Sequence, residues 1–194
     1  MILRAILLFV FGGAFLLTGM IQHKGLTIGD EATDFSLDNV DGTVISLETY
    51  EHARGYIVIF TCNSCPYAQA YQGRISLLHQ QYAAKGYPVI AINTSDSKAE
   101  IIARATEQQY PFPYLHDESQ DVSRAYGATK TPHAYVLTKD KKVAYVGAID
   151  NNYKNAADAD QHYVKDAVDA LLANKEVPVQ STRAIGCSIK WKNS

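Results

Sequence analysis

Two short apolar runs, each followed by a helical pattern, constrain the fold of this chain most strongly. Residues 56–61 form a short, continuous apolar run rich in β-branched side chains, which is typical of a strand buried on both faces of a sheet. Residues 87–95 predict a second buried strand. Residues 68–84 then carry apolar side chains at spacings of three and four, and residues 97–109 open with a capping-box pattern. Strands that alternate with helices predict a parallel β-α-β unit.

The segments around this unit predict one α/β domain with a mixed central sheet flanked by helices. Residues 27–50 hold two strand-like pieces around an Asp-Gly turn, which predicts a β-hairpin before the main fold. Further along, residues 133–140 and 143–150 predict an antiparallel strand pair, and residues 159–174 predict a closing amphipathic helix. A chain of 194 residues accommodates one such domain with a short extension.

The N-terminus differs in kind from the rest of the chain. Residues 5–21 are almost unbroken in apolar character, with Arg4 before them and Lys24 after them. This length is close to the lower limit for spanning a bilayer, and no clean cleavage site follows it. We therefore predict a signal peptide or membrane anchor over residues 1–23, with the remainder exported, in a bacterium to the periplasmic side.

The rest of the chain divides into a folded domain, residues 24–176, and a C-terminal tail, residues 177–194, that shows no clear period. The formal net charge of −2 gives no electrostatic reason to expect a nucleic-acid partner. Three cysteines are too few for a disulfide framework. Cys62 and Cys65 are paired by their spacing, whereas Cys187 stands alone in the tail. This pattern favours a reactive pair over structural cross-linking.

Cys62 and Cys65 fall where a buried strand ends and a helix begins. Unpaired backbone N–H groups and the helix dipole stabilise an anion there, and the thiolate is the nucleophile of disulfide exchange. We expect Cys62 to attack a client disulfide and Cys65 to resolve the mixed disulfide. Pro66 suits the first helical turn. The partners would be a protein disulfide or dithiol, or an external thiol donor, and no cofactor is required.

Other chemistries remain open for the same cysteines. A thiol peroxidase would use Cys65 against peroxide. A metal-handling protein would bind through Cys62, Cys65 and His133, although a structural zinc site needs four ligands, usually from two such pairs. A purely structural disulfide between Cys62 and Cys65 closes too small a loop to stabilise the fold much.

Six motifs occur in order between residues 28 and 194: "IGDEATDFSL", "CNSCPY", "FPYLHDESQDVSRAYGA", the Thr131-Pro132 pair, "YVGAID" and "GCSIKW". In this combination the chain resembles the thioredoxin superfamily, and specifically its peroxiredoxin-like branch of redoxins (AhpC/TSA type) that carries a CxxC pair. The resemblance implies a thioredoxin-like fold and thiol–disulfide oxidoreductase activity.

The resemblance also assigns roles to particular residues. Pro132 would be a cis-proline facing the cysteines, and Thr131 would contact the substrate, because the backbone beside this proline pairs with the bound substrate's chain in the superfamily. Cys65 resembles the peroxidatic cysteine in position. A peroxiredoxin would carry threonine where Cys62 stands, and this departure favours dithiol exchange over peroxide reduction.

Four further residues are auxiliary candidates. Asn63 and Ser64 lie between the cysteines, and Ser64 replaces a histidine that is frequent in this branch. His133 either compensates for that histidine or is a solvated loop residue. Cys187 is either a relay thiol or a small buried apolar residue, and the second interpretation is favoured because nothing in the sequence places the tail near Cys62.

Overall fold

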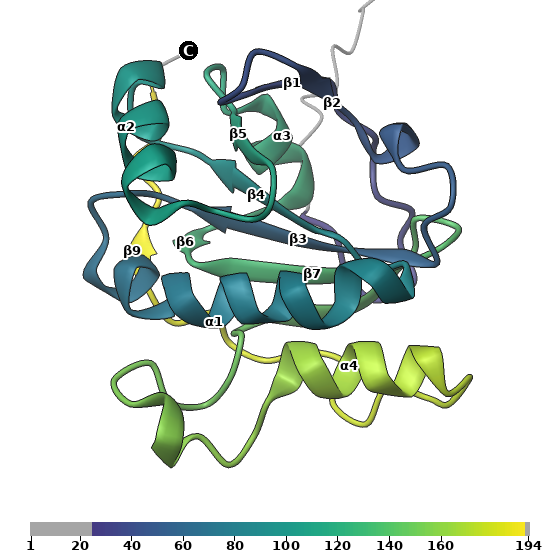
Figure 1. Ribbon diagram of the computed structural model, residues 1–194. Coiled ribbons are helices and arrows are strands. Elements are labelled where there is room, and N and C mark those ends of the chain that lie inside the picture. The colour runs from purple at the N-terminus through teal and green to yellow at the C-terminus, as the bar shows by residue number, and fades with distance from the viewer. Residues whose placement is uncertain (1–24, 193–194) are drawn as a thin grey trace, which may run out of the picture.

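The computed structural model describes residues 25–192, so the predicted leader at residues 1–23 lies outside the described part. A seven-stranded sheet of order β2-β1-β5-β4-β3-β7-β8 forms the centre of the molecule, and a separate two-stranded ribbon pairs β6 with β9 (Figure 1). The strands are β1 (Leu37–Asn39), β2 (Val44–Ile45), β3 (Gly55–Thr61), β4 (Val89–Asn93), β5 (Tyr114–His116), β6 (Lys130–Thr131), β7 (His133–Thr138), β8 (Val143–Gly147) and β9 (Cys187–Ser188). The α-helices are α1 (Pro66–Tyr82), α2 (Lys98–Gln108), α3 (Asp121–Tyr126) and α4 (Tyr163–Leu172), and the short 3-10 turns are Leu47–Thr49, Ala83–Lys85 and Ala156–Asp158.

The predicted fold class is confirmed. Strand β3 runs parallel to β4, and β4 runs parallel to β5, which gives the β-α-β arrangement. Strands β7 and β8 extend the sheet in antiparallel fashion, and β1 and β2 form the N-terminal hairpin with Leu37 opposite Ile45. The extended segment before α3 supplies β5, which the sequence did not identify as a sheet strand.

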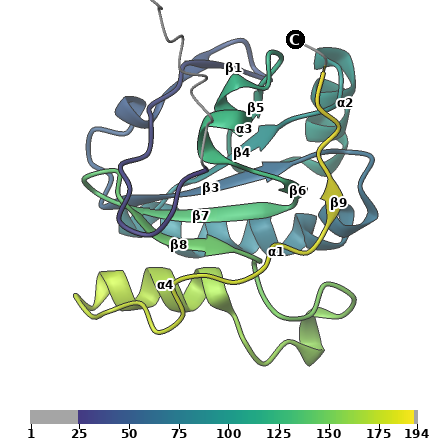
Figure 2. The ribbon, with the colours of Figure 1, turned by 180° about the vertical axis from the view of Figure 1, so that it is seen from behind.

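Alternate residues of β3 serve the two faces of the sheet. Ile57 and Ile59 point into a core shared with α1, α2 and α4, whereas Val58 and Phe60 point into a second core that includes Tyr126 of α3. The views from opposite sides show α1 and α4 covering one face and α3 the other (Figures 1 and 2). Because every residue of β3 is buried, both faces must be apolar, and the sequence run is accordingly continuous rather than alternating.

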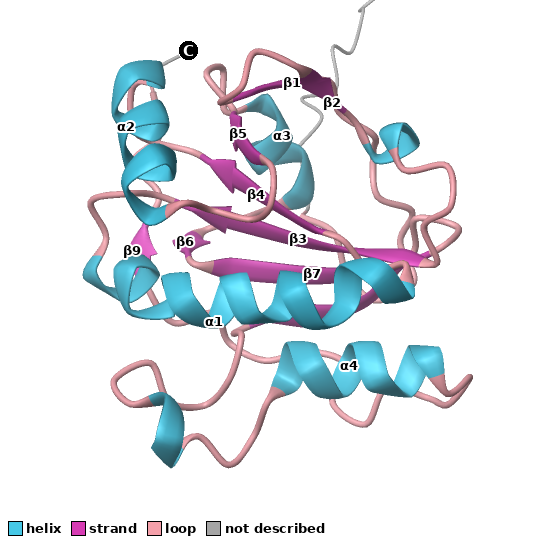
Figure 3. Ribbon diagram, in the orientation of Figure 1, coloured by secondary structure: helices cyan, strands magenta, loops and turns pink. Residues whose placement is uncertain are grey.

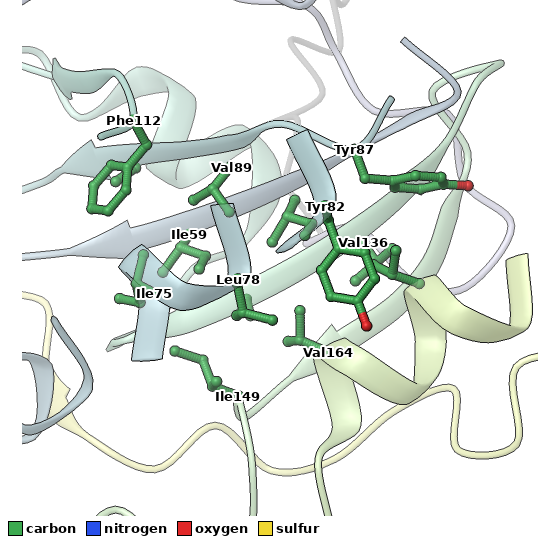
Figure 4. Close-up of a cluster of buried hydrophobic side chains, with 14 of the residues drawn as sticks. Ile59, Ile75, Leu78, Tyr82, Tyr87, Val89, Phe112, Val136, Ile149 and Val164 are labelled. Atoms are coloured by element: carbon green, nitrogen blue, oxygen red, sulfur yellow. The ribbon is translucent and has the colours of Figure 1, made fainter. Parts of the chain in front are cut away.

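The core beneath α1 packs this helix against the sheet. Figure 4 shows side chains of α1 directed at those of β3, β4 and β7, among them Ile59, Ile75, Leu78, Val89 and Val136. A charged contact adds to this packing, since Arg74 donates to the Asp150 carboxylate at 2.6 Å and both side chains are largely buried. This packing positions α1, whose N-terminal end closely follows the end of β3 in the chain.

Two boundaries differ from the sequence prediction for local reasons. The secondary-structure view shows the long helix α1 and the short helical turn in the loop that leads to α4 (Figure 3). Helix α1 begins at Pro66 rather than residue 68, because proline is pre-organised for the first helical position. Helix α4 begins at Tyr163 rather than residue 159, after a loop with a single 3-10 turn. Between residues 25 and 192, no helix is both long enough and apolar enough to cross a membrane.

Candidate active site

The paired cysteines lie at the carboxyl end of β3, where α1 begins. Cys62 follows the last residue of β3, and Cys65 is the N-cap residue of α1 with Pro66 in the first turn. Both side chains are buried, with exposed fractions of 6% for Cys62 and 2% for Cys65. The structure therefore puts the pair at the predicted junction of strand and helix, but deeper than an open surface site.

Thr131 contacts both sulfur atoms. The Cys62 Sγ lies 3.1 Å from the Thr131 hydroxyl, and the Cys65 thiol donates to the Thr131 carbonyl oxygen at 3.1 Å. The peptide bond from Thr131 to Pro132 is cis, as the resemblance predicted. The two segments that the sequence placed far apart thus form one site.

Asn63 fixes the loop between the two cysteines. Its backbone N–H donates to Asp96 Oδ2 at 2.6 Å, and its side-chain carbonyl accepts from the Tyr114 hydroxyl at 2.6 Å. Asn93 donates to both Tyr114 and Asp96, which closes the network. Asn63 is therefore a positioning residue, whereas Ser64 is exposed.

The sequence analysis did not single out Asp96. It lies just beyond β4 in the chain, at the edge where the parallel strands β3 and β4 both end. Residues that follow neighbouring parallel strands meet at one edge of a sheet. That rule was the available signal, and it would have drawn attention to Asp96.

His133 is neither a solvated loop residue nor a source of positive charge. It is buried at the start of β7 and packs against the ring of Tyr135, with ring centres 4.9 Å apart. Its Nδ1 accepts from the Thr129 N–H at 3.4 Å. Burial lowers the pKa of His133 to about 4, so the imidazole is neutral near pH 7 and supplies no cation for a thiolate.

Cys187 lies beside Cys65, although nothing in the sequence placed the tail near the pair and the favoured interpretation was a small buried apolar residue. Strand β9 pairs with β6 so that Cys187 is opposite Thr131, the same residue that contacts both other sulfurs. Cys187 packs against the cluster formed by Cys62, Cys65 and Ala68, and its side chain is half-buried. The sequence carried no helical or strand period that could reveal a two-residue strand.

The three thiols differ in acidity. Burial raises the pKa of Cys62, and the hydrogen bond with the Thr131 hydroxyl offsets only part of this effect. Burial also opposes ionisation of Cys65, but hydrogen bonds from the Cys187 thiol and the Ala68 N–H outweigh it and lower the pKa of Cys65. The pKa of Cys187 is raised to about 11 by burial and by the adjacent Cys65.

These directions place the first negative charge on Cys65. The sequence analysis instead expected Cys62 to be the first nucleophile and Cys65 the resolving cysteine. These two roles remain a prediction. Ionisation of Cys65 disfavours ionisation of Cys187, because loss of a second proton would put two thiolates side by side.

Metal binding gains no support from the geometry. Across residues 25–192 there is no group of three or more histidine, cysteine or acidic side chains arranged to hold a metal ion. His133, the third ligand of that alternative, makes its contacts with Thr129 and Tyr135 instead.

The chain is similar to several proteins of known sequence or structure. The profile of the AhpC/TSA family matches residues 28–146. A thiol-disulfide oxidoreductase ResA from Bacillus cereus is 23% identical over 150 residues, which cover 74% of this chain and 84% of that protein.

Among solved structures, an uncharacterized conserved protein from Geobacillus kaustophilus is 37% identical with a TM-score of 0.81, covering 87% of this chain and 94% of the other. A hypothetical protein from Sinorhizobium meliloti is 31% identical with a TM-score of 0.81, covering 88% and 98%. A putative thiol:disulfide interchange protein DsbE from Chlorobium tepidum, at 21% identity and a TM-score of 0.65, covers 76% and 99% and shares the fold.

Proposed function

The chain belongs to the AhpC/TSA family, and from that premise we propose that it is an exported thiol–disulfide oxidoreductase that works through a Cys62–Cys65 disulfide. The curated relatives named thiol-disulfide oxidoreductase support this activity. The observation that carries the proposal is the contact of both sulfurs with Thr131 beside the cis-proline.

The proposed reaction exchanges one disulfide for another. The Cys62 thiolate attacks a client disulfide, forms a mixed disulfide and releases one client thiolate, which takes up a proton. Cys65 then attacks the Cys62 sulfur, the second client thiolate leaves, and the protein retains the Cys62–Cys65 disulfide. The client gains two electrons that the cysteine pair loses, and the reverse sequence oxidises a client dithiol.

The lowered pKa of Cys65 suits the resolving step. A resolving cysteine must be a thiolate while the mixed disulfide exists, and hydrogen bonds from Cys187 and Ala68 favour that form. Cys62 depends on the Thr131 hydroxyl for the same purpose. A polar groove beside Ser64, lined by Asp96, Glu100 and Arg104 among others, offers a surface for a protein client.

Export and anchoring are proposed from residues 5–21 alone. That segment is apolar and near the length needed to span a bilayer. Location outside the cytoplasm would place the cysteines where disulfide chemistry persists.

A redox titration of the full-length protein tests the activity. The Cys187→Ser variant is equilibrated in glutathione buffers, and free thiols are trapped with a mass-shifting alkylating agent. We expect Cys62 and Cys65 to oxidise together in one two-electron step. A midpoint reduction potential of about −120 mV would identify an oxidant, and one of about −270 mV a reductant. If the two thiols never form a disulfide in this variant, the proposed function is wrong.

One observation favours a second candidate function, thiol peroxidase activity. Cys65 is the N-cap residue of α1 and has a lowered pKa, and a thiolate at a helix N-terminus is a reactive nucleophile. It would attack a peroxide oxygen, become a sulfenic acid and release water or an alcohol after protonation. Peroxide consumption by the Cys62→Ser variant, assayed with an external thiol, would support this candidate, and an unchanged peroxide concentration would exclude it.

A further inference from the structure

Cys187 lies in a tail that is fastened along its length to the domain. Ile189 donates its N–H to the Thr129 carbonyl at 3.1 Å, and Lys130 Nζ donates to Ser188 Oγ at 2.8 Å. Further along, the side chain of Gln120 donates to the Lys190 carbonyl and accepts from the Lys192 N–H. These bonds fix the register in which Cys187 faces Thr131.

Gly186 permits the close approach of this strand. A methyl group added at position 186 would lie 2.1 Å from the Thr131 carbonyl oxygen and 2.6 Å from its carbon. That carbonyl oxygen is also the acceptor of the Cys65 thiol. The backbone before Cys187 and the sulfur of Cys65 therefore lie on the same peptide group.

The three cysteines differ in how accessible they are to solvent. Cys62 and Cys65 are buried, whereas Cys187 is half-buried and is the most exposed of the three. It lies in the same apolar cluster as the other two cysteines. An external thiol would therefore reach a disulfide that includes Cys187 more easily than the disulfide of the more buried pair.

We propose that Cys187 is a third redox thiol that forms a disulfide with Cys65, in alternation with the Cys62–Cys65 disulfide. This inference rests on the proposed function and extends it. The disulfide bond would move from the buried pair to Cys65 and Cys187, where an external thiol can reach it more easily.

The proposed step conserves atoms and electrons within the chain. The Cys187 thiolate attacks the Cys65 sulfur of the Cys62–Cys65 disulfide, the Cys65–Cys187 bond forms, and Cys62 leaves as a thiolate. The proton released by Cys187 is taken up by Cys62. No external oxidant or reductant is consumed until an outside thiol attacks the new disulfide at Cys187.

Peptide mapping of the full-length Cys62→Ser variant tests the proposal. After equilibration in glutathione buffer and blocking of free thiols, trypsin releases Cys65 within residues 55–74 and Cys187 within residues 184–190. We expect the linked pair of peptides to be the main oxidised product, and to be lost in the Cys62→Ser, Cys187→Ser double variant. If Cys65 and Cys187 are instead modified separately by glutathione or the blocking agent, the proposal is overturned.

Gly186→Ala in the Cys62→Ser background tests whether strand position causes the linkage. We expect the linked fraction to fall, because the added methyl group must push β9 away from Thr131. Gly73→Ala is the matched control, since a methyl group there meets nothing within 4 Å, and the linked fraction should not change. An unchanged fraction in Gly186→Ala would count against the proposal.

These experiments separate the two hypotheses. The Cys187→Ser titration reports only on Cys62–Cys65, and the Cys62→Ser mapping reports only on Cys65–Cys187. Failure of the second with success of the first would leave the oxidoreductase proposal intact and remove the role of Cys187.

Discussion

Cys65 lies between two regions that are built in different ways. On one side, the β3–α1 junction supplies Cys62 and Asn63 from neighbouring positions in the chain, held by a buried side-chain network. On the other side, the β6–β9 ribbon holds Cys187, which comes from the distant tail. The two strands of this ribbon are joined through only two pairs of residues. The first region is fixed by local structure and core packing, whereas the second depends on contacts that are closer to the surface.

The two regions should differ in the free energy of local opening. Segments with few buried contacts and more exposed backbone hydrogen bonds open at lower free energy than core elements. Trp191, which follows β9 in the tail, is exposed, while the junction adjoins β3, which is buried throughout. We therefore expect the Cys187 side to detach before the Cys62 side changes.

The largest effect is expected from Cys65→Ser, because Cys65 is common to both proposed disulfides. This variant should lose every intramolecular disulfide and fall to the uncatalysed rate of disulfide exchange with a model protein client. Turnover and thiol trapping measure the loss. The control is Cys187→Ser, which should keep the Cys62–Cys65 disulfide. Residual turnover in Cys65→Ser comparable to the wild type would show that the two sides do not converge on this sulfur.

A pH titration of stability should separate the two regions through His133. Its pKa is about 4 in the folded protein, lowered from an ordinary value of 6.5 by burial. Below pH 6.5 the unfolded chain binds a proton that the folded chain does not, so stability falls as the pH drops from about 6.5 to 4. The loss should reach roughly 3 kcal/mol and level off below the folded pKa.

Chemical denaturation at a series of pH values measures this loss. His133→Asn should flatten the dependence between pH 6.5 and 4, whereas His52→Asn, at an exposed position, should leave it unchanged. Because His133 Nδ1 accepts from Thr129, and Thr129 accepts from Ile189 of the tail, protonation would loosen the ribbon side in particular. A flat wild-type profile would contradict the assignment of a buried neutral imidazole.

The same contrast explains what the sequence could predict. The apolar run of β3, the spacing of the cysteines and Pro66 are local signals, and they located the junction correctly. The capping box before α2 was also correct, since Ser97 and Glu100 bond reciprocally. Local patterns report on elements whose stability comes from their own residues and from burial of one face.

Contacts between segments that are distant in the chain left no such local pattern in the sequence. Strand β9 has two residues and pairs with a two-residue partner, so no period could develop. Asp96 approaches Cys62 only because β3 and β4 lie side by side in parallel. The burial of His133 likewise follows from its register opposite Phe60, which is a property of the assembled sheet. The sequence therefore revealed the pair of cysteines, and the resemblance added the cis-proline segment beside them, but neither revealed Asp96, the burial of His133 or the position of Cys187.

Asn63→Ala tests the junction side alone. The change leaves the buried Tyr114 O–H without its acceptor, while the same hydroxyl still accepts from Asn93. The lost acceptor should cost about 2 kcal/mol of unfolding free energy. Denaturant unfolding measures the cost, and Ser64→Ala, at an exposed neighbouring position, should change stability by less than about 0.5 kcal/mol. Equal effects of the two substitutions would mean that the network around Asn63 does not hold the loop.

The smallest effect is expected from Trp191→Ala, which tests the ribbon side alone. The Arg124 guanidinium carbon lies 4.5 Å from the centre of the Trp191 ring, and such a contact at a partly exposed site contributes about 0.5–1 kcal/mol. Its loss should raise the rate of Cys187 alkylation in the reduced protein by roughly two- to fivefold through easier detachment of the tail. Val179→Ala, another partly exposed apolar position in the tail, is the control and should leave that rate unchanged. The Cys62 alkylation rate should stay constant in both variants, and a parallel rise at Cys62 would mean that the two sides of Cys65 open as one unit.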